Sequence, residues 1–184
     1  MSKKYFKIED DLEADNRWML GNLNLPENIA WDDIEAKSLV DIVDWTIEIF
    51  VPGDPLDVTV IDFGLLMATK QFIDLLPSNE IEYNEIKVKN FKSHNRYFLI
   101  SVKNSIDCVD KKKSRYKIWE ANNEVRPDLA GQYEYFTQLR VDPKKIYPYS
   151  ICLVKGYEVV RLISEEIRDK FEMLKLKGIK FSDV

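Results

Sequence analysis

The stretch Trp45-Thr46-Ile47-Glu48-Ile49-Phe50-Val51 places apolar side chains at every second position from Trp45 to Val51. A period of two, with β-branched residues among them, is typical of a β-strand that has one face in the core. Pro52-Gly53-Asp54-Pro55 follows directly and predicts a turn, because proline and glycine interrupt regular structure. We therefore expect a strand over residues 45–51, with Trp45 in the core.

Further strands are expected on both sides of this segment. Within residues 95–103, one apolar set, Phe98, Ile100 and Val102, alternates with Tyr97 and Leu99. Because both sets are apolar, this strand is expected in the middle of a sheet, with both of its faces covered. The other predicted strands are residues 5–8, 17–20, 80–90, 114–119, 149–154 and 157–160, the last two joined through Lys155-Gly156 as a candidate hairpin.

The clearest helix is expected after Ser164, which is a favourable N-cap and is followed by two glutamates in the first turn. Gly178 is expected to end this helix as its C′ residue, and the segment after it to form a terminal strand in which Phe181 packs on the sheet. The predicted buried face of this C-terminal helix consists of Ile163, Ile167, Phe171 and Leu174.

A shorter helix is predicted over residues 70–76, where Thr69 is a candidate N-cap and Pro77 cannot continue the helix. Strands thus outnumber helices and the two do not alternate regularly. We therefore predict an α+β fold with a mainly antiparallel sheet, a few helices and a C-terminal amphipathic helix. With 184 residues, the chain is expected to form a single domain over residues 1–184.

Composition narrows the class of protein. Apolar residues make up 45% of the chain and charged residues 32%, which is typical of a folded globular protein. The first residues lack the apolar core of a signal peptide, and no stretch reaches the roughly 18 apolar residues of a membrane span. Only two cysteines occur, which favours a reducing compartment. We therefore expect a cytoplasmic protein that does not enter a membrane.

Residues with catalytic chemistry are sparse. The single histidine, His94, excludes a zinc site built from several histidines, and we expect it in an exposed turn. Cys108 and Cys152 stand in apolar surroundings, as buried inert thiols do. Glycine-rich phosphate loops and G-x-S-x-G are absent. We therefore predict no cofactor, no metal and no catalytic residue. An enzyme that uses carboxylates such as Asp107 and Asp110, with or without a metal, stays an alternative.

The basic cluster lies in residues 111–119, where three lysines precede Arg115 and Lys117. Tyr116 and Trp119 are interleaved with them, as aromatic residues are in many surfaces that bind nucleic acids. The acidic total charge of −5 favours a solvated loop between two strands instead. A nucleic-acid-binding module is therefore the second alternative.

An ordered set of short motifs runs through most of the chain. It comprises Tyr5-Phe6, Trp18, Pro55-Leu56-Asp57, Met67-Ala68-Thr69, Leu75-Leu76, Tyr97-Phe98-Leu99-Ile100, Ile106-Asp107-Cys108-Val109-Asp110, Ser114, residues 151–154 and Gly178-Ile179-Lys180-Phe181. In this order the set resembles immunity family eleven of the bacterial polymorphic-toxin systems. The resemblance implies a cytoplasmic, non-enzymatic protein that binds and neutralises a cognate protein toxin. It carries over no catalytic residue, and Asp107, Asp110 and Ser114 are interpreted as residues that fix a turn.

Acidic residues are concentrated in the first third of the chain. Residues 1–60 hold 5 basic and 14 acidic residues, whereas residues 61–184 hold 22 basic and 18 acidic residues. Because many toxin domains are cationic, an acidic inhibitor would associate with them faster. The predicted contact surface lies within residues 31–45, with Trp31 as an anchor and Trp45 in the core. Its residues are Trp31, Asp32, Asp33, Glu35, Asp41 and Asp44.

Overall fold

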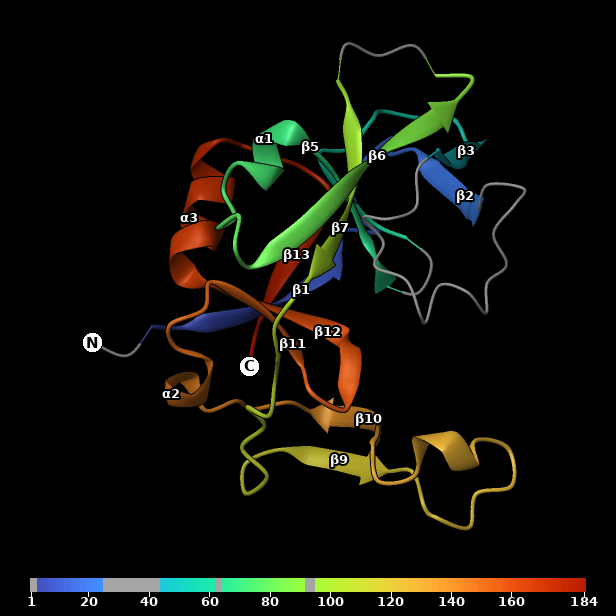
Figure 1. Cartoon of the computed structure of the whole chain (residues 1–184). Coiled ribbons are helices and arrows are strands. Elements are labelled where there is room, and N and C mark those ends of the chain that lie inside the picture. Colours follow the sequence, from blue (N-terminus) through green and yellow to red (C-terminus); the bar gives the residue numbers. More distant parts are fainter. Residues whose placement is uncertain (1–2, 25–43, 62–63, 92–94) are drawn as a thin grey trace.

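Two β-sheets carry the fold, and short helices cover their sides (Figure 1). The computed structural model describes residues 3–24, 44–61, 64–91 and 95–184. A six-stranded sheet has the order β2 (Met19–Asn24), β3 (Trp45–Val51), β6 (Ile81–Lys89), β7 (Tyr97–Val102), β5 (Leu66–Thr69) and β4 (Val58–Val60). A five-stranded sheet has the order β13 (Ile179–Asp183), β1 (Tyr5–Asp10), β12 (Tyr157–Ser164), β11 (Ile151–Val154) and β8 (Ser105–Ile106).

A two-stranded ribbon forms an arm at the end of the molecule opposite α1 in Figure 1. Its strands are β9 (Arg115–Ile118) and β10 (Tyr133–Gln138), and a 3₁₀ turn at Pro127–Leu129 lies in the connection between them. The helices are α1 (Lys70–Ile73), α2 (Pro143–Ile146) and α3 (Glu165–Met173). Among the described strand pairs, β3–β6 and β8–β11 are parallel and the others antiparallel, so the predicted α+β class with a mainly antiparallel arrangement is confirmed.

The strand predicted over residues 45–51 is present as β3. Trp45 and Ile47 are fully buried, while Thr46 and Glu48 lie on the other face. β3 pairs with β2 on one side and with β6 on the other, so it lies inside the sheet. The alternation in the sequence therefore predicted both the strand and the buried position of Trp45.

The doubly covered strand is also confirmed. β7 lies between β6 and β5, and its two apolar sets enter two different cores. Phe98, Ile100 and Val102 face the core between the two sheets, where α1 and α3 also pack. Tyr97 and Leu99 face a second core on the other side of the six-stranded sheet. A third core lies beneath the five-stranded sheet, against the arm and α2.

The second core is enclosed because the six-stranded sheet curls. Its edge strands β2 and β4 approach each other, and residues of both line one groove of about 220 Å³. The indole Nε1 of Trp18, just before β2, donates to Thr59 Oγ1 in β4 at 3.4 Å. This hydrogen bond links the two edges of the sheet, and Trp18 and Trp45 lie in the second core between them.

Helix boundaries differ from the predictions. The helix predicted over residues 70–76 is only four residues long, and turns lead from it to Pro77. The caps at Thr69 and Ser164 are correctly placed, but neither side chain makes a capping hydrogen bond. The C-terminal helix ends at Met173, so Leu174 follows it and is 40% exposed instead of buried.

Gly178 is not the C′ residue of the helix, because Lys175, with φ 55°, already takes the left-handed conformation there. Gly178 has φ 115°, and a Cβ at this position would lie 1.8 Å from the carbonyl oxygen of Val58. Glycine is therefore required for a close approach of two chain segments. The terminal strand forms as β13, and Phe181 packs edge to face on Phe171 at 5.3 Å between ring centroids.

Candidate partner-binding surface

Most of the predicted contact surface lies outside the described residues. The predicted contact residues outside the described part are Trp31, Asp32, Asp33, Glu35 and Asp41. Asp44 is described and is exposed, and its carboxylate accepts a hydrogen bond from Lys87 Nζ at 2.8 Å. This contact raises the pKa of Lys87. Of the six predicted contact residues, Asp44 is thus the one within the described part of the chain.

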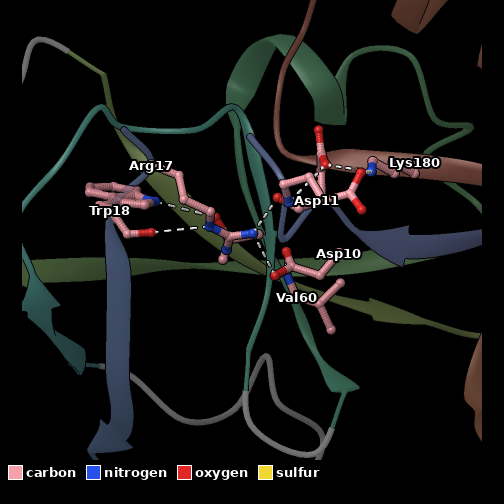
Figure 2. Close-up of polar contacts among 8 residues, drawn as sticks. Asp10, Asp11, Arg17, Trp18, Val60 and Lys180 are labelled. Atoms are coloured by element: carbon pink, nitrogen blue, oxygen red, sulfur yellow. Dashed lines mark hydrogen bonds and ion pairs between the residues drawn. The ribbon is translucent and has the colours of Figure 1, made fainter. Parts of the chain in front are cut away.

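A second acidic segment, residues 10–15, begins at the last residue of β1 and holds a half-buried ion pair at its start (Figure 2). Arg17 lies 2.8 Å from the Asp10 carboxylate, and both side chains are largely shielded from water. The same guanidinium donates to the carbonyl of Asp11 at 2.6 Å and to that of Trp18 at 3.3 Å. Arg17 therefore closes the acidic segment into a loop against the start of β2.

Asp10 also bridges the two sheets. Its other carboxylate oxygen accepts from the backbone N–H of Val60 at 3.2 Å, on the free edge of β4 (Figure 2). A backbone donor on an edge strand needs an acceptor, which the carboxylate supplies in place of a neighbouring strand. Asp10 and Arg17 thus hold β1, β4 and the start of β2 together beside the groove of about 220 Å³.

The outer part of the acidic segment contacts β13. Lys180 binds Glu13 and lies 3.1 Å from the Asp11 carboxylate, and these two acids raise its pKa. Ion pairs of this kind, exposed to water, contribute little to stability. They do hold the loop over β13, which leaves Leu12 between them 74% exposed.

The turn after β3 fixes the segment from its other side. Asp54 N–H donates to the Asn16 carbonyl at 2.6 Å, and the Asp54 carbonyl accepts from Trp18 N–H at 3.0 Å. Gly53 lies so close that a Cβ there would come within 2.5 Å of backbone atoms of Arg17 and Asn16. The predicted turn at residues 52–55 therefore contacts Asn16, Arg17 and Trp18, which directly follow the acidic segment.

Four exposed apolar side chains lie around this region. They are Leu12, Met19, Phe50 and Val51, and we call them the apolar strip. Met19 and Val51 are cross-strand partners at the ends of β2 and β3. Leu12 and Met19 line the groove of about 220 Å³, and Phe50 lines a second groove of about 440 Å³. Gly21 borders both grooves, so the two grooves adjoin at the edge strand β2.

One signal in the sequence pointed to the strip. In residues 45–51, Phe50 occupies a position of the polar set, with Thr46 and Glu48, and a large apolar residue there must face water. Leu12 gave a similar signal as the apolar residue within an acidic run. Neither residue was predicted as a contact, because nothing in the sequence places the two side chains near each other.

The basic cluster was expected to be a solvated loop, and a stacking surface belonged to the nucleic-acid-binding alternative. Tyr116 packs against Tyr133 and Phe136, with ring centroids at 5.1 and 5.9 Å, so its face is used inside the arm. Lys117 lies 2.8 Å from Glu134, and Lys113 lies 3.2 Å from Asp110. These contacts support the interpretation of the cluster as a charged, solvated ribbon.

The Asp–Ser motif fixes a turn at two of its three positions. Asp110 Oδ1 accepts from the backbone N–H groups of Lys112 and Lys113, at 3.1 and 3.3 Å. Ser114 Oγ donates to the Arg140 carbonyl and accepts from its N–H, both at 2.9 Å. Asp107 is exposed and has no such contact among the described residues, so the role expected for it is not observed.

The groups considered for catalysis are placed as follows. Cys108 and Cys152 are free and fully buried, as predicted. The hydrogen bond with Cys108, together with burial, raises the pKa of the Cys152 thiol. His94 lies outside the described residues. Within residues 3–24, 44–61, 64–91 and 95–184, no three His, Cys, Asp or Glu side chains are placed to hold a metal ion. No helix of that same part is long and apolar enough to span a membrane.

The family is established by comparison. The model of the immunity protein family Imm11 matches residues 52–184, which is most of the chain. The protein therefore belongs to the Imm11 immunity protein family, and the resemblance seen in its motifs is confirmed. Comparison with curated proteins gives no match. The acidic segment and the apolar strip precede the matched residues.

Proposed function

We propose that this protein binds a cognate bacterial toxin of a polymorphic-toxin system in the cytoplasm and neutralises it without catalysis. Membership of the immunity family, from the match over residues 52–184, is the observation that carries this proposal. An inhibitor of this kind needs a complementary surface and no reactive group. Loops and strand ends held in place by half-buried polar contacts would suit such a surface.

The toxin is proposed to be cationic. Residues 1–60 carry 14 acidic and 5 basic residues, and the described part of that segment shows Glu13, Asp15 and Asp54 exposed. A negative surface speeds the approach of a positive partner and makes the association rate sensitive to salt. The same charge opposes binding to the phosphates of nucleic acids and to anionic membranes.

The test is protection together with direct binding. The toxin domain encoded beside this gene is expressed in a bacterial host with and without this protein, and an inactive toxin variant is used to measure the dissociation constant. We expect growth to be restored and a stoichiometric complex to form. Protection by substoichiometric amounts, or protection without a complex, would show that the protein acts as an enzyme instead. Absence of both protection and binding would reject the proposal.

A further inference from the structure

We infer that the apolar strip, Leu12, Met19, Phe50 and Val51, is the surface that docks the toxin, and that the toxin meets it with apolar side chains surrounded by basic ones. This inference rests on the proposed function and assigns it a place on the molecule. The exposure of Phe50, at 78%, and of Leu12, at 74%, is the first observation. Clustered apolar side chains left in water mark contact surfaces more often than isolated ones do.

The shape of the surface suits a protein partner. The grooves on either side of Gly21 have volumes of about 220 and 440 Å³ and are open to solvent. One lies between the edge strands β2 and β4, and the other runs along β2 and β3. Side chains of a partner can enter both grooves while its backbone passes over the strip. Large side chains seated in such hollows supply most of the binding free energy at protein interfaces.

The charge around the strip selects the partner. Acidic residues lie beside the strip residues: Asp11 and Glu13 flank Leu12 in the chain, Glu48 lines the groove of Phe50, and Asp54 is hydrogen-bonded to Asn16 next to Asp15. Three basic groups of the described residues here bind acids: Arg17 binds Asp10, Lys180 binds Asp11 and Glu13, and Lys89 binds Glu48 at 3.0 Å. The surface is therefore negative around an apolar centre, and the complementary surface is apolar with a basic surround.

The same charge argues against a second copy of this chain as the occupant. In a two-fold symmetric dimer the same patch of both subunits would meet, so the acids around one strip would face those around the other. Like charges brought together in this way cost free energy and slow association. A cationic partner of different sequence has no such penalty.

The place of the strip in the chain fits a contact that is specific to one partner. Its residues lie at positions 12–51, before the residues 52–184 that match the family. A contact surface outside the matched part can differ from one member to another while the matched frame is kept, which is one way to obtain specificity for one partner. The matched part supplies the frame, since β4, β6 and β13 support β3 and the acidic segment.

The experiment measures association and dissociation of the inactive cognate toxin domain on the full-length protein. The test variant combines Leu12→Ala with Phe50→Ala. The control combines Val125→Ala with Met173→Ala, which removes apolar side chains that are 82% and 73% exposed on the arm connection and at the end of α3. We expect the dissociation constant to rise at least about tenfold in the test variant, mainly through faster dissociation, and to change less than about twofold in the control.

A second variant, Asp15→Asn with Asp54→Asn, tests the charge. Its association rate should fall about threefold or more at low salt and approach that of the wild type at high salt, while dissociation changes little. Thermal melting of each variant shows that it is folded. A test variant that binds as tightly as the wild type would overturn the inference and leave the proposed function intact. If the wild type binds no toxin, the proposed function fails and the inference with it. A concentration-dependent dimer that Phe50→Ala abolishes would assign the strip to a second copy and also overturn it.

Discussion

Glu80 joins the two sheets through a buried carboxylate, and its removal should destabilise the protein strongly. The residue precedes β6 and is only 6% exposed. Its Oε2 accepts from the backbone N–H groups of Ser150 and Ile151, at 2.8 and 3.0 Å, where β11 begins in the other sheet. Without the carboxylate, two donors in the core would have no acceptor, and the cost of such groups exceeds the net value of the bonds themselves.

The magnitude follows from these two bonds. A hydrogen bond to a charged group contributes about 1.5–3 kcal/mol, and part of the loss is recovered because the carboxylate no longer has to be buried. We therefore expect Glu80→Ala to lower the free energy of unfolding by about 3–5 kcal/mol. Glu80→Gln keeps one acceptor oxygen and should lose about 2 kcal/mol. At roughly 2–4 °C per kcal/mol for a chain of this size, Glu80→Ala should melt about 6–20 °C lower.

The assay is urea unfolding followed by circular dichroism, with Glu82→Ala as the matched control. Glu82 lies two residues further along, and its ion pair with Lys103 at 3.5 Å is partly exposed, so its loss should cost at most about 1 kcal/mol. If Glu80→Ala unfolds within about 1 kcal/mol of the wild type with an unchanged slope, the carboxylate does not join the sheets as argued here.

Three further predictions concern the buried part of the molecule. Gly178→Ala should lower the free energy of unfolding by about 2–3 kcal/mol or more, because the new Cβ would meet the carbonyl of Val58. Gly131→Ala, with φ 84° and no atom within 4 Å of its Cβ, should lower it only by the backbone strain of about 1 kcal/mol. Equal melting temperatures for the two variants would contradict this. Burial raises the pKa of Tyr5 to about 12, so the contribution of its neutral form to stability is complete below pH 10 and is lost as the pH rises toward 12. In denaturant titrations, Tyr5→Phe should remove about 1.4 kcal/mol per pH unit of that decline in the free energy of unfolding. Cys108 and Cys152 should react with a thiol reagent only at the rate of unfolding, because both are buried. Their replacement by alanine should leave toxin binding unchanged. Rapid labelling of the native protein would show that the thiols are accessible, and loss of binding in a folded variant would show that they are functional.

Periodicity predicted several of the longer elements, among them β3 and β7, but the six-residue strand β10 was not predicted. β3 and β7 span seven and six residues, and their alternation indicated which side chains are buried. β4 has three residues and α2 has four, and neither was predicted, because less than two full periods does not distinguish a strand or helix from a turn. The segment predicted as a helix over residues 70–76 is also short, about two helical turns, and only its first turn is helical.

Pairing between distant segments could not be predicted from the sequence. β1 lies between β12 and β13, more than 150 residues away along the chain, and no local pattern indicates these neighbours. The end of α3 shows the same limit. Gly178 has the spacing of a helix C′ residue, but its conformation is set by the approach of Val58 from another sheet. A glycine that must pass close to backbone and a glycine that ends a helix look alike in the sequence.

The acidic first third shows how fold and surface depend on each other. Asp10 belongs by charge to the same run as Glu13 and Asp15, yet its carboxylate is half-buried against Arg17 and the free edge of β4. Charge counting cannot separate an acid that closes a sheet from an acid that meets a partner, because only burial distinguishes them. Asp10 and Arg17 fix the loop on which Leu12 stands before any partner arrives. A surface held in this way loses less conformational entropy on binding, so more of the contact free energy of the apolar strip can appear as affinity.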